Sequence, residues 1–274
     1  MLEFLADEFR AIHEICSNYK KVKAPFKVGI LNCWGKIRSW IDDDINDWTK
    51  PYRGGILECL SGLNVDIEFM SFDDVLTNGI SEDVKVIINS GDVNTSWSGG
   101  DVWKNEKLVT LIRKWVYENA GAFIGVGDPT ATAYQGHFFQ LFDVLGVDRE
   151  LGYSKSAAKL PFKNVENHFI TEDIKDFEDL RNKKDRVFKS YMGTEVLLSD
   201  DENVLAAANS YGSGRAIYFS ALPFSAATTR LLLRAMYWAT KNEDKLKVWF
   251  SSNPKVEGTA FKDAKKLVVL NNSL

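Results

Sequence analysis

The sequence has no apolar run long enough to cross a bilayer and no Lys/Arg-rich run that stands out as a nucleic-acid or membrane patch. A transmembrane helix needs roughly 20 consecutive apolar residues, and every apolar run here is interrupted well before that length. The 34 Lys and Arg residues are outnumbered by 38 Asp and Glu residues, which leaves a net charge of −4. Proteins that bind nucleic acid or anionic membranes carry a basic excess, so we expect neither as a partner.

Cysteine and histidine are also scarce, with three residues of each type in 274. So few cysteines in a chain of this length predict buried thiols in a reducing compartment. The histidines have no second His, Cys or acid at the spacing of metal ligands, so we expect no metal and no cofactor. Acidic residues stand where a signal peptide would be basic, and we therefore expect a cytoplasmic protein.

The sequence does contain short apolar strands that alternate with amphipathic helices. Strands are expected over residues 26–33, 65–69, 84–89 and 122–127, and helices over residues 55–63 and 107–118. Strands that are apolar on successive residues are typical of a parallel sheet buried on both faces. The alternation predicts an α/β fold with a doubly wound, mainly parallel sheet of the flavodoxin type.

The two ends of the chain differ in character from this middle part. Residues 2–19 are expected to form an amphipathic helix, which a basic linker ending at Pro25 separates from the first strand. Residues 160–190 are dense in charge and are expected to form an exposed excursion. A glycine-containing turn at 211–215 predicts a hairpin, and a helix is expected over 225–240. Strands at 248–250 and 267–270 then predict a short β-rich C-terminal extension.

Three loops that follow expected strands combine polar residues with glycine and, in two of them, tryptophan. Ligands of doubly wound sheets bind beyond the carboxyl ends of the strands, which is where these loops lie. A tryptophan ring beside amide and carboxylate groups suits a sugar, although each tryptophan can instead pack beneath its own loop. The candidate rim residues are Asn32, Trp34, Asp92, Trp97 and Asp128.

The sequence does not complete the motifs of several common nucleotide-binding and catalytic sites. The sequence has no phosphate-binding G-x-x-x-x-G-K-[ST] element, and residues 125–130 lack the third glycine of a dinucleotide fingerprint. In class I glutamine amidotransferases the same turn carries a cysteine nucleophile, whereas here the position is Gly127. Glycine cannot form an acyl-enzyme. The acids at 42–44 are interpreted as a solvated charge run.

Longer motifs resemble one family across nearly the whole chain. They are VGILNCWGKIRSW at 28–40, LSGLNVD at 60–66, INSGD at 88–92, WSGG at 97–100, FIGVGDP at 123–129, YGSGR at 211–215 and LPF at 222–224. These segments resemble the central domain of the lacto-N-biose/galacto-N-biose phosphorylases, also called 1,3-β-galactosyl-N-acetylhexosamine phosphorylases. The resemblance implies a class I amidotransferase-like α/β domain that lies between a TIM barrel and a β-domain.

The resemblance also implies how the chain is divided and what the enzyme does. Residues 1–25 would be the last barrel helix and a linker, 26–244 the α/β domain, and 245–274 the start of the β-domain. In this family, inorganic phosphate attacks the anomeric carbon of a galactosyl disaccharide with inversion and gives α-galactose 1-phosphate. The family's catalytic acid lies on the barrel, so no catalytic residue is carried over to this chain. A homo-oligomer is expected.

Two other interpretations remain open at this point. The chain can be a non-catalytic module that mediates oligomerisation or covers the sugar site of a galactosidase-like enzyme. It can also be an independent amidotransferase-like hydrolase, which the glycine at position 127 disfavours.

Overall fold

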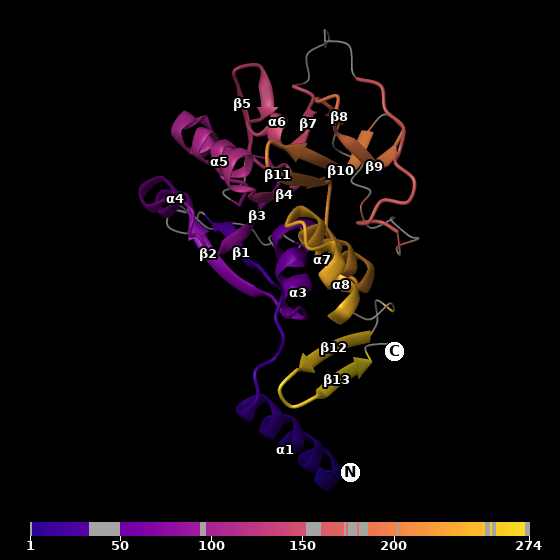
Figure 1. The fold of residues 1–274 in the computed structure, drawn as a ribbon. Helices are drawn as coiled ribbons and strands as arrows, with labels where there is room; N and C mark the ends of the chain where they lie inside the picture. The colour runs from indigo at the N-terminus through magenta and orange to yellow at the C-terminus, as the bar shows by residue number, and fades with distance from the viewer. Residues whose placement is uncertain are drawn as a thin grey trace.

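The computed structural model describes residues 2–32, 50–93, 97–151, 160–172, 174, 180, 186–201, 203–249, 253 and 256–271. Its centre is a seven-stranded sheet in the order β2-β1-β3-β4-β11-β10-β9 (Figure 1). The strands are β1 (Lys27–Asn32), β2 (Asp66–Ser71), β3 (Val84–Gly91), β4 (Ala122–Gly127), β9 (Glu195–Asp200), β10 (Asn203–Tyr211) and β11 (Gly214–Phe219). The expected strands in the first half of the chain are therefore present.

The sheet is mixed, so the prediction of a doubly wound sheet of the flavodoxin or class I amidotransferase type is wrong. The five strands from β2 to β11 are parallel to one another, but β10 runs antiparallel to both β11 and β9. The reason is the short turn between β10 and β11, where Gly212 has a φ of +59°. A tight turn joins only antiparallel strands, whereas parallel strands need a long crossover.

Helices cover both faces of the sheet and enclose two apolar cores. One core includes Val86, Ile88 and Ile124 and packs against α3 (Gly55–Ser61) and α7 (Ala226–Ala239). The other includes Ile87 and Phe123 and packs against α4 (Phe72–Asn78), α5 (Glu106–Asn119) and α6 (Phe142–Leu145). Val86 and Ile88 are fully buried, as expected for a strand covered on both faces.

Side-chain caps fix where several of these helices begin. The Ser71 hydroxyl accepts a hydrogen bond from the Asp74 N–H at 3.0 Å, and the Asp74 carboxylate accepts one from the Ser71 N–H at 3.1 Å. Ser225 and Thr228 make the same reciprocal pair at the start of α7. Asn105 caps α5 by accepting from the Lys107 N–H. Each cap satisfies backbone donors that the first helical turn leaves free.

Four smaller pieces were not expected from the sequence. A hairpin of β5 (Ala131–Tyr134) and β6 (His137–Phe139) follows β4, and β7 (Val147–Arg149) pairs with β8 (Val187–Lys189). The short helical segments η2 (Lys50–Gly54) and η3 (Gly100–Lys104) precede α3 and α5. All of them lie in connections between the strands of the main sheet.

The charge-dense segment 160–190 is not simply an exposed excursion. Ile170 and Leu180 are buried in the core that contains α7. The Arg234 guanidinium on α7 donates to the Phe169 carbonyl oxygen, pairs with the Glu172 carboxylate and lies over the Phe169 ring. These contacts hold the described part of the segment against the helix.

The two ends of the chain lie together, away from the sheet (Figure 1). Helix α1 (Leu2–Asn18) is present as expected, and β12 (Val256–Phe261) pairs with β13 (Lys266–Asn271). The strand expected at 248–250 is wrong for its first two residues, because they belong to α8 (Glu243–Trp249), whose first turn carries two acids that favour a helix N-terminus. Among the described residues, none of the helices combines the length and apolar character needed to span a membrane.

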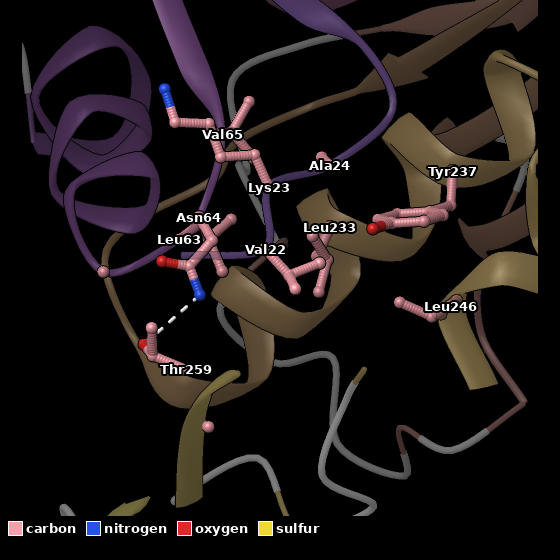
Figure 2. A pocket seen from close by; sticks show the side chains of 12 residues that line it. Val22, Lys23, Ala24, Leu63, Asn64, Val65, Leu233, Tyr237, Leu246 and Thr259 are labelled. Carbon is pink, nitrogen blue, oxygen red and sulfur yellow. Dashed lines mark hydrogen bonds between the residues drawn. The ribbon is translucent and has the colours of Figure 1, made fainter. Parts of the chain in front are cut away.

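The linker after α1 ties the C-terminal hairpin to the sheet. The Val22 N–H donates to the Ala260 carbonyl at 2.8 Å, and the Ala24 N–H donates to the Asn64 carbonyl at 2.8 Å. Asn64 also donates from its side-chain amide to the Thr259 hydroxyl, as Figure 2 shows. The small cavity beside these contacts has a volume of about 60 Å³. Since each water takes about 30 Å³ in the liquid, it is too small for an organic ligand.

Candidate functional site

The loops that follow β3 and β4 lie side by side at the carboxyl edge of the parallel strands. Gly91 and Gly127 are register partners at the ends of these strands, and the Asp128 N–H donates to the Gly91 carbonyl at 2.8 Å. Gly127 has a φ of +77°, and a Cβ placed there would lie 2.6 Å from the Gly91 carbonyl oxygen. The turn therefore has no space for a nucleophilic side chain at this position.

Asp128 is a buried, charge-paired carboxylate. Its side chain is 1% exposed, and it forms an ion pair with the Arg149 guanidinium of β7. It also accepts a hydrogen bond from the Val93 N–H at 2.9 Å, in the loop that follows β3. A buried charge is tolerated only when it is paired and hydrogen-bonded. Asp128 thus joins the loop after β3 to β7.

Trp97 is half-buried and lies against a cation. The Arg53 guanidinium carbon lies 4.9 Å from the centre of the Trp97 ring. Arg53 also donates to the Leu31 carbonyl at 3.3 Å, near the end of β1. This arrangement connects the end of β1 to the loop after β3, and cation–π contacts of this kind contribute roughly 0.5–2 kcal/mol.

Hydrogen bonds from buried side chains fix the backbone next to Trp97. The Ser98 carbonyl accepts a hydrogen bond from the Asn89 side-chain amide at 3.1 Å and another from the Trp103 indole N–H. Asn89, Ser98 and Trp103 are all buried. Because buried residues hold the backbone next to it, the half-buried Trp97 ring has a defined position at the edge of the sheet.

The structure brings most of the candidate rim residues to one edge. Asp92, Trp97 and Asp128 follow the adjacent strands β3 and β4, and Asn32 is the last residue of the neighbouring strand β1. Asp92 is half-buried, and its carboxylate accepts from the Val93 N–H at 2.8 Å. Trp34 and the acids at 42–44 lie outside the described residues.

Two charged residues of this edge, Arg53 and Arg149, were missed from the sequence. Neither lies in a recognisable motif, and each reaches a partner that is distant in the chain, Trp97 and Asp128 respectively. Only Asp128 indicated in the sequence that a basic partner exists, because a carboxylate directly after a buried strand needs a counter-charge.

Other reactive groups in the described structure do not assemble into a metal or nucleophile site. Within those ranges, no group of three or more His, Cys, Asp and Glu side chains is placed to hold a metal ion. Burial raises the pKa of the Cys59 thiol, which makes it a poor nucleophile. Burial likewise lowers the pKa of His168, whose ring lies 5.3 Å from the Trp238 ring.

The family model and the curated relatives that match this chain point to the same family. The family model described as the lacto-N-biose phosphorylase central domain matches residues 27–244. The 1,3-β-galactosyl-N-acetylhexosamine phosphorylase of Bifidobacterium longum is 40% identical, over 98% of this chain and 40% of that protein. One from Lachnoclostridium phytofermentans is 39% identical, over 99% of this chain and 38% of that protein. The chain thus spans about two fifths of these curated relatives.

A more distant relative and solved structures were also found. The D-galactosyl-β-1→4-L-rhamnose phosphorylase of Lachnoclostridium phytofermentans is 29% identical, over 99% of this chain and 37% of that protein. The β-galactosidase of Rahnella sp. R3 aligns with a TM-score of 0.48 at 14% identity, covering 81% of this chain and 32% of that chain. A thua-like protein of Bacteroides uniformis gives the same TM-score and identity, covering 94% of its own chain. Structural likeness of this size carries no argument about function.

Proposed function

The chain belongs to the family of lacto-N-biose phosphorylase central domains, and from that premise we propose that it works as the central part of a galactoside phosphorylase. The substrates of the whole enzyme are a β-1,3-galactosyl-N-acetylhexosamine and inorganic phosphate. Its products are α-galactose 1-phosphate and the free N-acetylhexosamine. The whole enzyme is proposed to be cytoplasmic and homo-oligomeric.

The observation that carries this proposal is the difference in identity among the relatives. Three curated 1,3-β-galactosyl-N-acetylhexosamine phosphorylases are 36–40% identical to the chain, whereas the galactosyl-rhamnose phosphorylase is 29% identical. Both groups match over almost all of this chain. The higher identities support a 1,3-β-galactosyl-N-acetylhexosamine phosphorylase as the proposed whole enzyme, while selection of the acceptor sugar is expected to lie largely in the barrel outside this chain.

The chemistry divides between this chain and the rest of the enzyme. A phosphate oxygen forms a bond to the anomeric carbon while the bond from that carbon to the leaving sugar oxygen breaks, and an acid supplies a proton to that oxygen. Phosphate is already an anionic nucleophile, so a general base is dispensable. The acid belongs to the part of the enzyme outside this chain, and no residue of the chain is proposed as catalytic.

The proposed role of this chain is to form a rim over the sugar site. Asp92 and Trp97 supply a polar group and an aromatic face at one sheet edge, and Asp128 positions the loop that bears Trp97. Asn32 and Trp34 stay proposed members of this rim. A covering rim excludes water, so that phosphate and not water reaches the anomeric carbon. Glycine at the elbow position, with no space for a larger residue, argues against an independent glutaminase.

The proposed division of the chain places boundaries at residues 25 and 244. The part between them has its own core on both faces of the sheet. Residues 1–25 and 245–274 are proposed to belong with neighbouring domains, a barrel and a β-domain. In support, α1 and β13 leave large apolar side chains uncovered in this chain.

A chimera tests the proposed function. The matching segment of the Bifidobacterium longum relative is replaced by this chain, and galactose 1-phosphate release from lacto-N-biose and phosphate is measured. The chimera is expected to be active and to need the flanking parts, since the chain alone is expected to release nothing. A folded chimera without phosphorolysis, or activity of the isolated chain, contradicts the proposal.

A further inference from the structure

A polar cavity lies between α5 and the β5–β6 hairpin, and none of the rim residues lines it. Its volume is about 250 Å³. Ligand sites in proteins commonly range from about 300 to 1,000 Å³, so this one suits a molecule of few atoms. Its polar walls are formed by Glu106 and Arg113 from α5 and by Tyr134, Gln135 and His137 from the hairpin.

His137 is held in one orientation by a buried carboxylate. Its Nδ1 lies 2.9 Å from an oxygen of Asp148, and its ring stacks on Phe142 with the ring centres 3.6 Å apart. The other oxygen of Asp148 accepts hydrogen bonds from the Phe139 N–H at 2.8 Å and the Phe138 N–H at 3.1 Å. An ionised carboxylate only accepts, so Nδ1 donates to it. The second ring nitrogen, Nε2, takes no part in this contact.

Glu106 offers a second acceptor in the cavity wall. One of its carboxylate oxygens accepts from the Gln135 side-chain amide at 3.0 Å and from the Tyr134 hydroxyl at 3.3 Å. Both donors are uncharged. They orient the carboxylate without neutralising it, so it retains the capacity to bind further hydroxyl donors.

Arg113 supplies the opposite charge, and its own charge is balanced. Its Nε donates to Asp143 at 3.0 Å, and an Nη donates to the Gln140 carbonyl at 2.9 Å. A small anion in the cavity would therefore face the carboxylate of Glu106, whereas a cation would face the guanidinium of Arg113. A hydroxyl group both donates and accepts, so a neutral molecule with several hydroxyls suits walls of both signs.

We propose that this cavity is a second binding site, which takes a neutral polyhydroxylated molecule of about monosaccharide size. The Glu106 carboxylate accepts hydrogen bonds from its hydroxyls, and the His137 ring adds a polar ring nitrogen to the wall. The cavity is separate from the rim residues, and its occupation does not depend on phosphorolysis.

Titration of the isotopically labelled chain by NMR tests the proposal. D-galactose, D-glucose and myo-inositol serve as neutral probes, with inorganic phosphate as the anionic probe and ethanolamine as the cationic probe. At least one neutral probe is expected to give saturable shifts in the amides of residues 106, 135 and 137. Absence of saturation with all three neutral probes, or equal binding of phosphate or ethanolamine in the cavity, overturns the proposal.

Matched variants locate the site. Glu106→Gln is expected to weaken binding of the neutral probe at least fivefold, while Glu118→Gln, at an exposed position of the same helix, leaves it unchanged. Trp97→Ala, at the rim, is also expected to leave it unchanged. Circular dichroism confirms that each variant is folded. If Trp97→Ala abolishes binding and Glu106→Gln does not, the probe binds at the rim and the cavity assignment is wrong.

Discussion

Ile88 in the sheet and Phe9 and Leu267 near the two ends are all large and apolar, but their surroundings differ. Ile88 is fully buried, whereas Phe9 is 70% exposed and Leu267 is 63% exposed. The sheet encloses its apolar residues between helices on both faces, while α1 and β13 present theirs to solvent. Burial of apolar surface is the dominant favourable term in folding. We infer that the sheet region folds without help from the two terminal elements, α1 and β13, and that these elements add little to its free energy of unfolding.

Ile88→Asp is expected to have the largest effect, because it places an unpaired charge between β1 and β4. Such a charge costs several kcal/mol against a total stability of about 5–15 kcal/mol. The variant should fail to give soluble, cooperatively melting protein, as measured by yield and circular dichroism. Leu267→Asp is the control and should fold normally. A cooperative melt for Ile88→Asp would show that the strand is not central.

Arg149→Met is expected to have the next largest effect, since it leaves the buried carboxylate of Asp128 without its ion-pair partner. Breaking a buried pair in this way costs about 3–5 kcal/mol. Urea unfolding of the variant measures the loss. The control is Arg186→Met, because Arg186 is 82% exposed and pairs with Glu150 at 3.8 Å. If Arg149→Met lowers the free energy of unfolding no more than the control does, the ion pair between Asp128 and Arg149 does not stabilise this edge.

His168 provides a smaller, pH-dependent test of burial in the sheet region. Burial lowers its pKa from the ordinary value of 6.5, although the Glu195 carboxylate partly opposes this shift. Between the lowered pKa and 6.5, the unfolded chain binds more protons than the folded chain. The free energy of unfolding should therefore fall as the pH drops below 6.5.

Urea unfolding at pH 7.5 and pH 5.5 measures this fall in stability. His168→Gln should make the difference between the two pH values smaller. An equal pH difference in His168→Gln and in the unaltered chain would show that the buried imidazole does not contribute.

Phe9→Ser is expected to have the smallest effect, within about 0.5 kcal/mol, as is usual for exposed positions. Its melting temperature should match that of the unaltered chain in a calorimetric scan. A loss above 1.5 kcal/mol, about three times that margin, would show that α1 packs on the rest of the chain, and the contrast between the sheet and its ends would fail.

Strands β1, β3 and β4 were predictable because each is apolar on most successive residues, whereas β9 (Glu195–Asp200) was not expected from the sequence. β4 begins and ends at the expected residues, and β1, β2 and β3 deviate by two residues at most. The β5–β6 hairpin was not predictable. Its turn residues Gln135 and Gly136 both have positive φ, and glutamine in such a turn lacks the Asn-Gly or Asp-Gly signature that marks a tight hairpin in a sequence.

The position of the candidate site was predictable, but its internal contacts were not. Residues that follow adjacent parallel strands must meet at one edge, which brings Asp92, Trp97 and Asp128 together. The burial of Asp128 depends on Arg149, which comes from a strand 21 residues later. The position of Trp97 depends on Arg53, in a segment that no local pattern connects to it. Charge pairing between distant segments is set by tertiary structure, and a single sequence does not display it.

The central claim is that the edge formed by β1, β3 and β4 serves the chemistry of a phosphorylase. The most direct test is kcat/KM for phosphorolysis of lacto-N-biose by the active chimera carrying Trp97→Ala, with the exposed Tyr191→Ala as the control. The account predicts at least a tenfold loss for Trp97→Ala, about 1.4 kcal/mol of transition-state stabilisation, with little change in melting temperature. A value of kcat/KM equal to that of the control, or a loss that tracks unfolding, would contradict it.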